Sequence, residues 1–258
     1  KEVVISWVGM DCWIRSFPRP LIQFFWRDYP KNQGGNMFGL RHVFYCGIQF
    51  SLLLGICFNA SAVVYVDKDR PGGNGTSWAQ AYNSLDAALA ANLYAAQEFW
   101  IAEGTYVPSS LNGFVLGQYQ NHSFYGGFAG NETSLSQRDV KNHPVVIDGL
   151  GSRKHLFYAT TFVEFVRVDG LTIQNGAASG GTVEDEGHGA GILINQVASA
   201  VIANCTFKNN SARELGGAVA VYNTNVVITG STFLNNSSIQ SGGGAARVGF
   251  APSGRIGH

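Results

Sequence analysis

Residues 202–210, IANCTFKNN, and residues 228–236, ITGSTFLNN, follow one pattern, and an earlier stretch, residues 168–176 (VDGLTIQNG), follows it too. The shared positions are an apolar residue, small or polar residues, Thr, a large apolar residue, one variable residue, Asn, and then Asn or Gly. The phenylalanines of the first two stretches quoted, Phe207 and Phe233, are 26 residues apart. A glycine-rich step follows each of these stretches, at 216–219 and 242–245, and these steps are also 26 residues apart. A repeat of about 20–50 residues is typical of solenoids, which present long surfaces to their partners.

Short β-rich segments separated by Gly and Asn predict strands, and matched strands with tight bends predict a parallel β-helix, an all-β solenoid. Stacked Asn side chains would bond along the stack, and Asn tolerates the left-handed backbone of a sharp bend. A β-sandwich also uses many short strands, but it needs no matched residues at a fixed interval. The expected ladder residues are Ile173, Phe207 and Phe233 in the core and Asn175, Asn209 and Asn235 at the bends.

The segment before the repeats predicts a cap, which a solenoid needs because an uncovered end exposes sheet edges and apolar core. The expected elements are a strand over 63–67, a turn-rich loop over 69–75, an alanine-rich helix over 85–91 and a strand over 99–102. Either Ser77 or Asn83-Ser84 can cap the helix. We therefore assign 63–113 to an N-terminal strand-helix-strand cap with the first coil, and 114–246 to the β-helix coils.

The last residues, 247–258, break the repeat and are expected to be irregular, as in a truncated reading of a longer protein. The first two repeats are 34 residues apart (Ile173 to Phe207), whereas the last two are 26 apart (Phe207 to Phe233). The segment Thr182–His188 explains the eight extra residues as a loop that projects from one coil.

The residues before the cap predict an export signal. A short basic region precedes an almost entirely apolar run, 43–57, and Ala60-Ser61-Ala62 supplies small residues before a polar sequence. This order is typical of a secretory signal peptide, which we assign to 37–62. The apolar run is short for a membrane span, although a retained anchor is the alternative. We expect Met37 to be the true start and 1–36, which show neither helical nor strand periodicity, to be misassigned.

The composition favours β structure and excludes an obvious nucleic-acid partner. The chain has 17 Lys+Arg and 17 Asp+Glu, so its formal net charge is +0 and no basic footprint appears. Its 33 glycines suit tight corners between strands. The four cysteines form no CxxC pair, and no zinc spacing is present. A mature chain would keep only Cys205, which we expect to be a small buried hydrophobe.

The Phe-x-x-Asn segments at 207–210 and 233–236, with Gly216-Gly217-Ala218-Val219, resemble the repeats of the bacterial polymorphic outer membrane proteins. Residues 65–106 are similar to the N-terminal region of secreted right-handed parallel β-helix proteins, and 125–139 (YGGFAGNETSLSQRD) matches the same group. The resemblance covers about 63–246. It implies a right-handed β-helix in an exported protein of the outer membrane, cell surface or extracellular medium, often adhesin-like, with no catalytic residues to carry over.

Candidate catalytic residues are few. Asp148 and Asp169 each stand between an apolar residue and Gly, which is typical of turns, although a lyase or hydrolase would need such carboxylates. His188 lies in a Gly-His-Gly triplet that is similar to a motif of polygalacturonase-type β-helix hydrolases, but their paired aspartates are missing. The candidate ligand loop consists of Glu184, Asp185, Glu186 and His188, and a solvated loop is its alternative interpretation.

No cofactor is expected. Asp67 and Asp69 lie near a Gly-Gly-Asn-Gly loop and are the candidates for Ca²⁺, but the ligand spacing of calcium loops is absent.

Two functions fit these observations. We favour a non-enzymatic, adhesin-like protein that binds glycans or cell-surface components and keeps no membrane span in its mature form. The alternative is a polysaccharide lyase or glycoside hydrolase, or its carbohydrate-binding part, on the same scaffold.

Overall fold

The computed structural model describes residues 2–7, 10–15, 23–27, 62–92, 97–116, 121–160, 163–180, 187–240, 243–249 and 255–256. The chain divides into two compact units, Lys1–Ile56 and Cys57–His258, each of which is described by itself. The expected signal peptide over 37–62 lies outside the described residues, apart from Ala62 at its end. The same holds for Glu184, Asp185 and Glu186 of the expected ligand loop.

The first unit contains a three-stranded antiparallel sheet, in the order β1-β2-β3. Its strands are β1 (Glu2–Trp7), β2 (Met10–Arg15) and β3 (Gln23–Arg27). Residues 1–36 carry no assignment from the sequence, because they show neither helical nor strand periodicity. The strands are nevertheless rich in β-branched and aromatic residues, which favour β structure by their side-chain shape.

The second unit consists of four parallel sheets and very little helix. Sheet I contains β4 (Ala62–Val66), β5 (Gln97–Ala102), β8 (His122–Phe128), β11 (Phe165–Asp169), β15 (Ser199–Ala203), β19 (Asn225–Thr229) and β23 (Arg255–Ile256). Sheet II contains β6 (Gly104–Tyr106), β9 (Val145–Asp148), β12 (Leu171–Gln174), β16 (Thr206–Lys208) and β20 (Thr232–Leu234). Sheet III contains β7 (Phe114–Val115), β10 (Phe157–Thr160), β14 (Ile192–Asn195), β18 (Val219–Tyr222) and β22 (Ala246–Gly249). Sheet IV contains β13 (Ala177–Ala178), β17 (Ser211–Ala212) and β21 (Ser237–Ser238).

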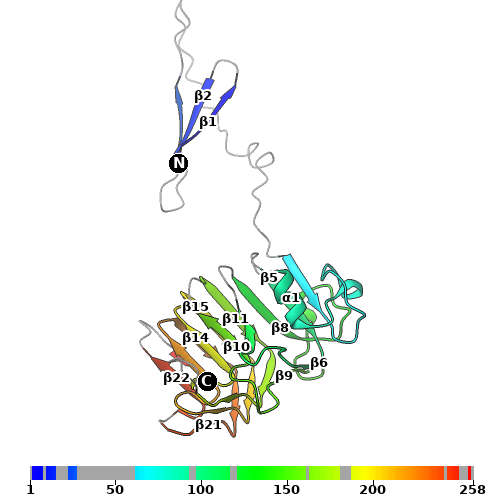
Figure 1. Cartoon of the computed structure of the whole chain (residues 1–258). Coiled ribbons are helices and arrows are strands. Elements are labelled where there is room, and N and C mark those ends of the chain that lie inside the picture. The colour runs from blue at the N-terminus through cyan, green and yellow to red at the C-terminus, as the bar shows by residue number, and fades with distance from the viewer. Residues whose placement is uncertain are drawn as a thin grey trace, which may run out of the picture. The chain divides into compact units, whose positions relative to one another are not determined.

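The chain visits these sheets cyclically. From β11 onward each repeat gives one strand to sheet I, then one to sheets II, IV and III, before it returns to sheet I. Every strand lies parallel to its counterpart in the next repeat, so β5, β8, β11 and β15 stack side by side (Figure 1). The unit is therefore an all-β structure of stacked parallel sheets. The tail that we expected to be irregular adds β22 and β23 to sheets III and I.

The only α-helix among the described residues matches the expected one. It is α1 (Leu85–Ala91), and the hydroxyl of Ser84 accepts a hydrogen bond from the backbone N–H of Ala87. Leu85, Ala88 and Leu89 are buried and belong to the main core. Two 3₁₀ turns, η2 (Trp78–Gln80) and η3 (Leu135–Gln137), lie in loops.

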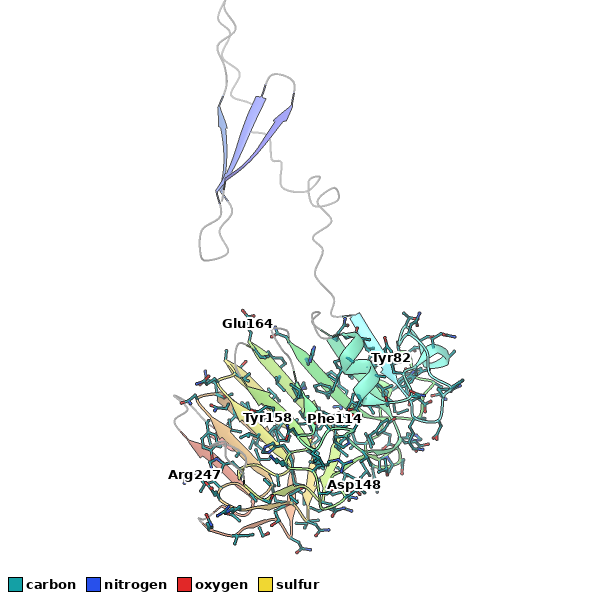
Figure 2. All side chains as sticks on the ribbon, viewed as in Figure 1. Tyr82, Phe114, Asp148, Tyr158, Glu164 and Arg247 are labelled. Atoms are coloured by element: carbon teal, nitrogen blue, oxygen red, sulfur yellow. The ribbon has the colours of Figure 1, made fainter. Side chains whose placement is uncertain are left out.

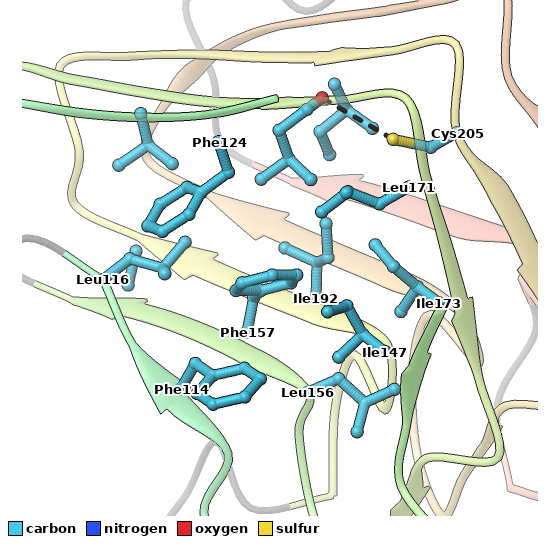
Figure 3. Packing of buried hydrophobic residues seen from close by; sticks show 14 of the residues in the cluster. Phe114, Leu116, Phe124, Ile147, Leu156, Phe157, Leu171, Ile173, Ile192 and Cys205 are labelled. Atoms are coloured by element: carbon cyan, nitrogen blue, oxygen red, sulfur yellow. Dashed lines mark hydrogen bonds between the residues drawn. The ribbon is translucent and has the colours of Figure 1, made fainter. Parts of the chain in front are cut away.

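The core is built from rows of apolar side chains that run across the sheets (Figure 3). In sheet II, Phe207 pairs in register with Ile173 on one side and Phe233 on the other. The rings of Phe207 and Phe233 stack with centroids 5.0 Å apart. Cys205 is buried beside this row, and burial raises the pKa of its thiol to about 12. Cys205 is therefore a buried hydrophobe, as predicted.

The bends after sheet II repeat as well. Asn175, Asn209 and Asn235 all have a left-handed backbone, with φ of 58°, 55° and 52°. Asn175 donates to Asp148 of the preceding coil, but at the next two bends the side-chain hydrogen bonds between repeats come from the following residue. Asn210 donates to the carbonyl of Ile173, and Asn236 donates to that of Phe207. Asn236 also accepts from the Asn210 amide at 3.0 Å. The side-chain amides that bond to each other along the stack are therefore those of Asn210 and Asn236, one position after the bend residues Asn209 and Asn235.

Candidate functional site

The structure gives Asp169 a buried ionic network. Its side chain is fully buried, and Arg138 and Arg167 contact its two oxygens at 2.7 and 2.6 Å. The amide of Asn204 donates to the same carboxylate at 3.0 Å. Both guanidinium groups also lie over the Tyr125 ring, at 5.3 and 5.6 Å from its centroid. Burial alone would raise the pKa of Asp169, but these hydrogen bonds and charges outweigh it and lower the pKa.

The carboxylate of Asp148 also accepts hydrogen bonds, from three donors. Gln174 donates to one carboxylate oxygen at 2.6 Å, while Asn175 and the backbone N–H of Leu150 donate to the other. Burial opposes ionisation, but the donors prevail and the pKa of Asp148 is lowered. A carboxylate with a lowered pKa holds no proton to donate near neutral pH. Asp148 therefore holds the bend that follows β9, and Asp169 secures the Arg138 loop to sheet I.

Acid should weaken the contribution of Asp148 to stability. Its folded pKa lies below the unfolded value of about 3.9, so its stabilisation is present above that pH and is lost as the pH falls through the folded pKa. We expect Asp148→Asn to be less stable than the natural chain at pH about 6, and the gap to shrink at pH about 3. Urea midpoints at the two pH values measure this. A gap that is unchanged at the lower pH would contradict the assignment.

His188 joins two residues that the sequence did not single out. Its Nε2 lies 3.0 Å from a carboxylate oxygen of Glu214, and its Nδ1 lies 3.0 Å from the hydroxyl of Tyr222. His188 is mostly buried, whereas the Glu214 side chain is 42% exposed. Glu214 stands 26 residues after His188, so the repeat spacing is the signal that could have linked these two residues. Tyr222 ends β18, 34 residues after His188, and no sequence pattern singles it out.

The His188 cluster has the order of an acid–base relay. A hydroxyl next to a ring nitrogen, with a carboxylate on the other nitrogen, lets the carboxylate orient the imidazole while the imidazole exchanges a proton with the hydroxyl. The rings of His188 and Tyr222 also contact each other, with their centroids 5.5 Å apart. This cluster is the candidate site with the clearest chemistry.

The carboxylate of Asp67 accepts hydrogen bonds from residues of its own loop. One carboxylate oxygen accepts from the backbone N–H of Asp69 at 3.0 Å, and the other accepts from Arg70 at 3.0 Å. In the part of the chain that the structure describes, no group of three or more His, Cys, Asp or Glu side chains could hold a metal ion.

Within the same described ranges, no helix is both long and apolar enough to cross a membrane. Comparisons of the chain with protein-family models, with characterised proteins and with solved structures gave no match.

Proposed function

We propose that the second unit is a right-handed parallel β-helix and that the protein is an exported, adhesin-like binding protein of the bacterial cell surface, outer membrane or extracellular medium. The support for the fold is the cyclic order of the strands, since each repeat returns to the same sheets in register. The resemblance to polymorphic outer membrane proteins adds the handedness and the export.

One contrast between inward and outward positions carries the binding role. In sheet II the inward row is apolar in every repeat: Ile147, Ile173 and Phe207 are fully buried, and Phe233 at the end of the row is partly buried. The adjacent row on the other face changes its chemistry at each step, and it consists of Asp148, Gln174, Lys208 and Leu234. Within it Asp148 is buried and bound by Gln174, so Lys208 and Leu234 are the members left for a partner. A scaffold that keeps its inside constant and varies its outside is suited to recognition of an extended partner. Glycans or cell-surface components are the proposed partners, and no cofactor is required.

Export is tested first. The chain is expressed from Met37 in a bacterium, and the exported fraction is analysed by N-terminal sequencing. We expect a mature protein that begins at Val63, because Ala60-Ser61-Ala62 fits the cleavage site. An exported protein that still carries Met37, or a chain that is not exported, would contradict the assigned signal peptide.

Binding is tested next with the natural chain on a glycan array and on intact cells. We expect retention that survives washing at physiological salt, since residues 63–258 hold 11 Lys+Arg and 14 Asp+Glu and their net charge of −3 provides no attraction to anionic surfaces. The heat-denatured chain is the control. Equal retention of the folded and denatured chains would contradict a folded binding surface.

A second candidate function, a polysaccharide lyase or glycoside hydrolase, is favoured by the His188 cluster alone. Such an enzyme would release unsaturated or reducing ends from acidic polysaccharides. The release should disappear in His188→Ala and in Tyr222→Phe, which removes one hydroxyl only. Release that persists in both variants would assign the activity elsewhere.

A further inference from the structure

A groove crosses three consecutive repeats where the chain turns from sheet III into sheet I. The groove is shallow and open to solvent, with a volume of about 470 Å³. The lining residues are Val163 and Glu164 from the turn before β11, Gln196, Val197 and Ala198 from the turn before β15, and Asn223 from the turn before β19. Glu164 lies far from Asp148 in Figure 2, so this groove is separate from the bends after sheet II.

Two of the lining residues have a left-handed backbone. Gln196 has φ of 58° and Asn223 has φ of 50°. Asn adopts this region readily, but Gln has no comparable preference, so Gln196 carries a conformational cost. Two hydrogen bonds hold the turn in place. The backbone N–H of Gln196 donates to the carbonyl of Tyr222, and the backbone N–H of Val197 donates to the side-chain hydroxyl of Thr224. Gln196 is therefore a position to test for function.

The groove combines polar groups with a small apolar base. The side chains of Glu164, Gln196 and Asn223 are exposed, while Val163 and Val197 are buried beneath them. The backbone carbonyl of Glu164 accepts from the backbone N–H and the hydroxyl of Ser199, and its side chain is exposed. Among the described residues, no ion pair joins this carboxylate to a cation.

We propose that this groove binds a neutral sugar chain that runs along the stack of repeats. A carboxylate accepts hydrogen bonds from sugar hydroxyls, and two amides both donate and accept. The negative charge of Glu164, which pairs with no cation among the described residues, disfavours uronates and other anionic sugars, because like charges repel. From Glu164 to Asn223 the groove crosses two strand spacings, about 10 Å, which suits a disaccharide unit. The proposal rests on the glycan-binding role above and assigns its site and ligand class.

Isothermal titration of the full chain tests the proposal with tetrasaccharides of glucose, xylose, mannose and galactose, and with tetragalacturonate. We expect at least one neutral tetrasaccharide to bind to the chain. Tetragalacturonate should bind more weakly than that neutral tetrasaccharide. Glu164→Gln and Gln196→Gly should each weaken binding about tenfold, because each removes hydrogen bonds to the ligand.

Gln196→Gly separates a binding role from a structural one. Glycine adopts positive φ without cost, so the variant should be at least as stable as the natural chain while it binds less well. Leu150→Gly is the matched control, because Leu150 also has positive φ, of 53°, and is 61% exposed, but does not line the groove. It should keep full binding.

Normal binding by Gln196→Gly, or preferred binding of tetragalacturonate, would overturn the proposal. So would a full chain that binds none of the five tetrasaccharides. If that chain were still retained on the glycan array or on cells, the groove assignment would fail while the proposed binding function would stand.

Discussion

Replacement of Asp169 by Ala should lower the free energy of unfolding by about 3 kcal/mol, because it leaves two arginines without their buried partner. The side chain of Asp169 is fully buried, whereas those of Arg138 and Arg167 are 17% and 30% exposed. The arginines can turn partly toward water, which keeps the loss at the lower end of the range for a broken buried pair. Urea unfolding of the two chains measures the difference.

A surface ion pair provides the matched control for this prediction. Asp69 contacts Lys68 at 2.7 Å, but its side chain is 72% exposed. Exposed pairs contribute little because water and salt screen the charges, so Asp69→Ala should barely change stability. Equal effects of Asp69→Ala and Asp169→Ala would show that the buried network is not a stabilising element.

Much of this fold could be predicted because the repeat is written in residue types with narrow structural roles. Asn at a left-handed bend and large apolar residues at inward positions leave few alternatives, so the Phe207–Phe233 stack follows from a spacing of 26 residues. The helix over 85–91 was also predicted with its limits, since a Ser-capped, alanine-rich segment has a clear start and periodicity.

Most partners within the sites could not be predicted in the same way. Glu214 stands one 26-residue repeat after His188, so the spacing could have paired them, but nothing in the spacing points to Tyr222, which lies 34 residues after His188. Arg138 reaches Asp169 from a loop 31 residues away, which has no repeat to align it. Side-chain geometry also decided which asparagines bond along the stack, since Asn209 makes the bend while Asn210 points back to its neighbours.

Replacement of Phe207 by Ala should cost about 3–5 kcal/mol, the largest effect that we expect from a single core position. Its ring is fully buried between Ile173 and Phe233, so no neighbour can move in without breaking the register of sheet II. Phe233→Ala should cost less because its ring is only partly buried. Leu234→Ala, at a side chain that is 49% exposed, should cost least. Urea midpoints of the three variants measure this order, and a loss for Phe233→Ala as large as that for Phe207→Ala would contradict it. The order matters for the whole unit, because in stacked repeats each row is stabilised only by the repeats on either side of it.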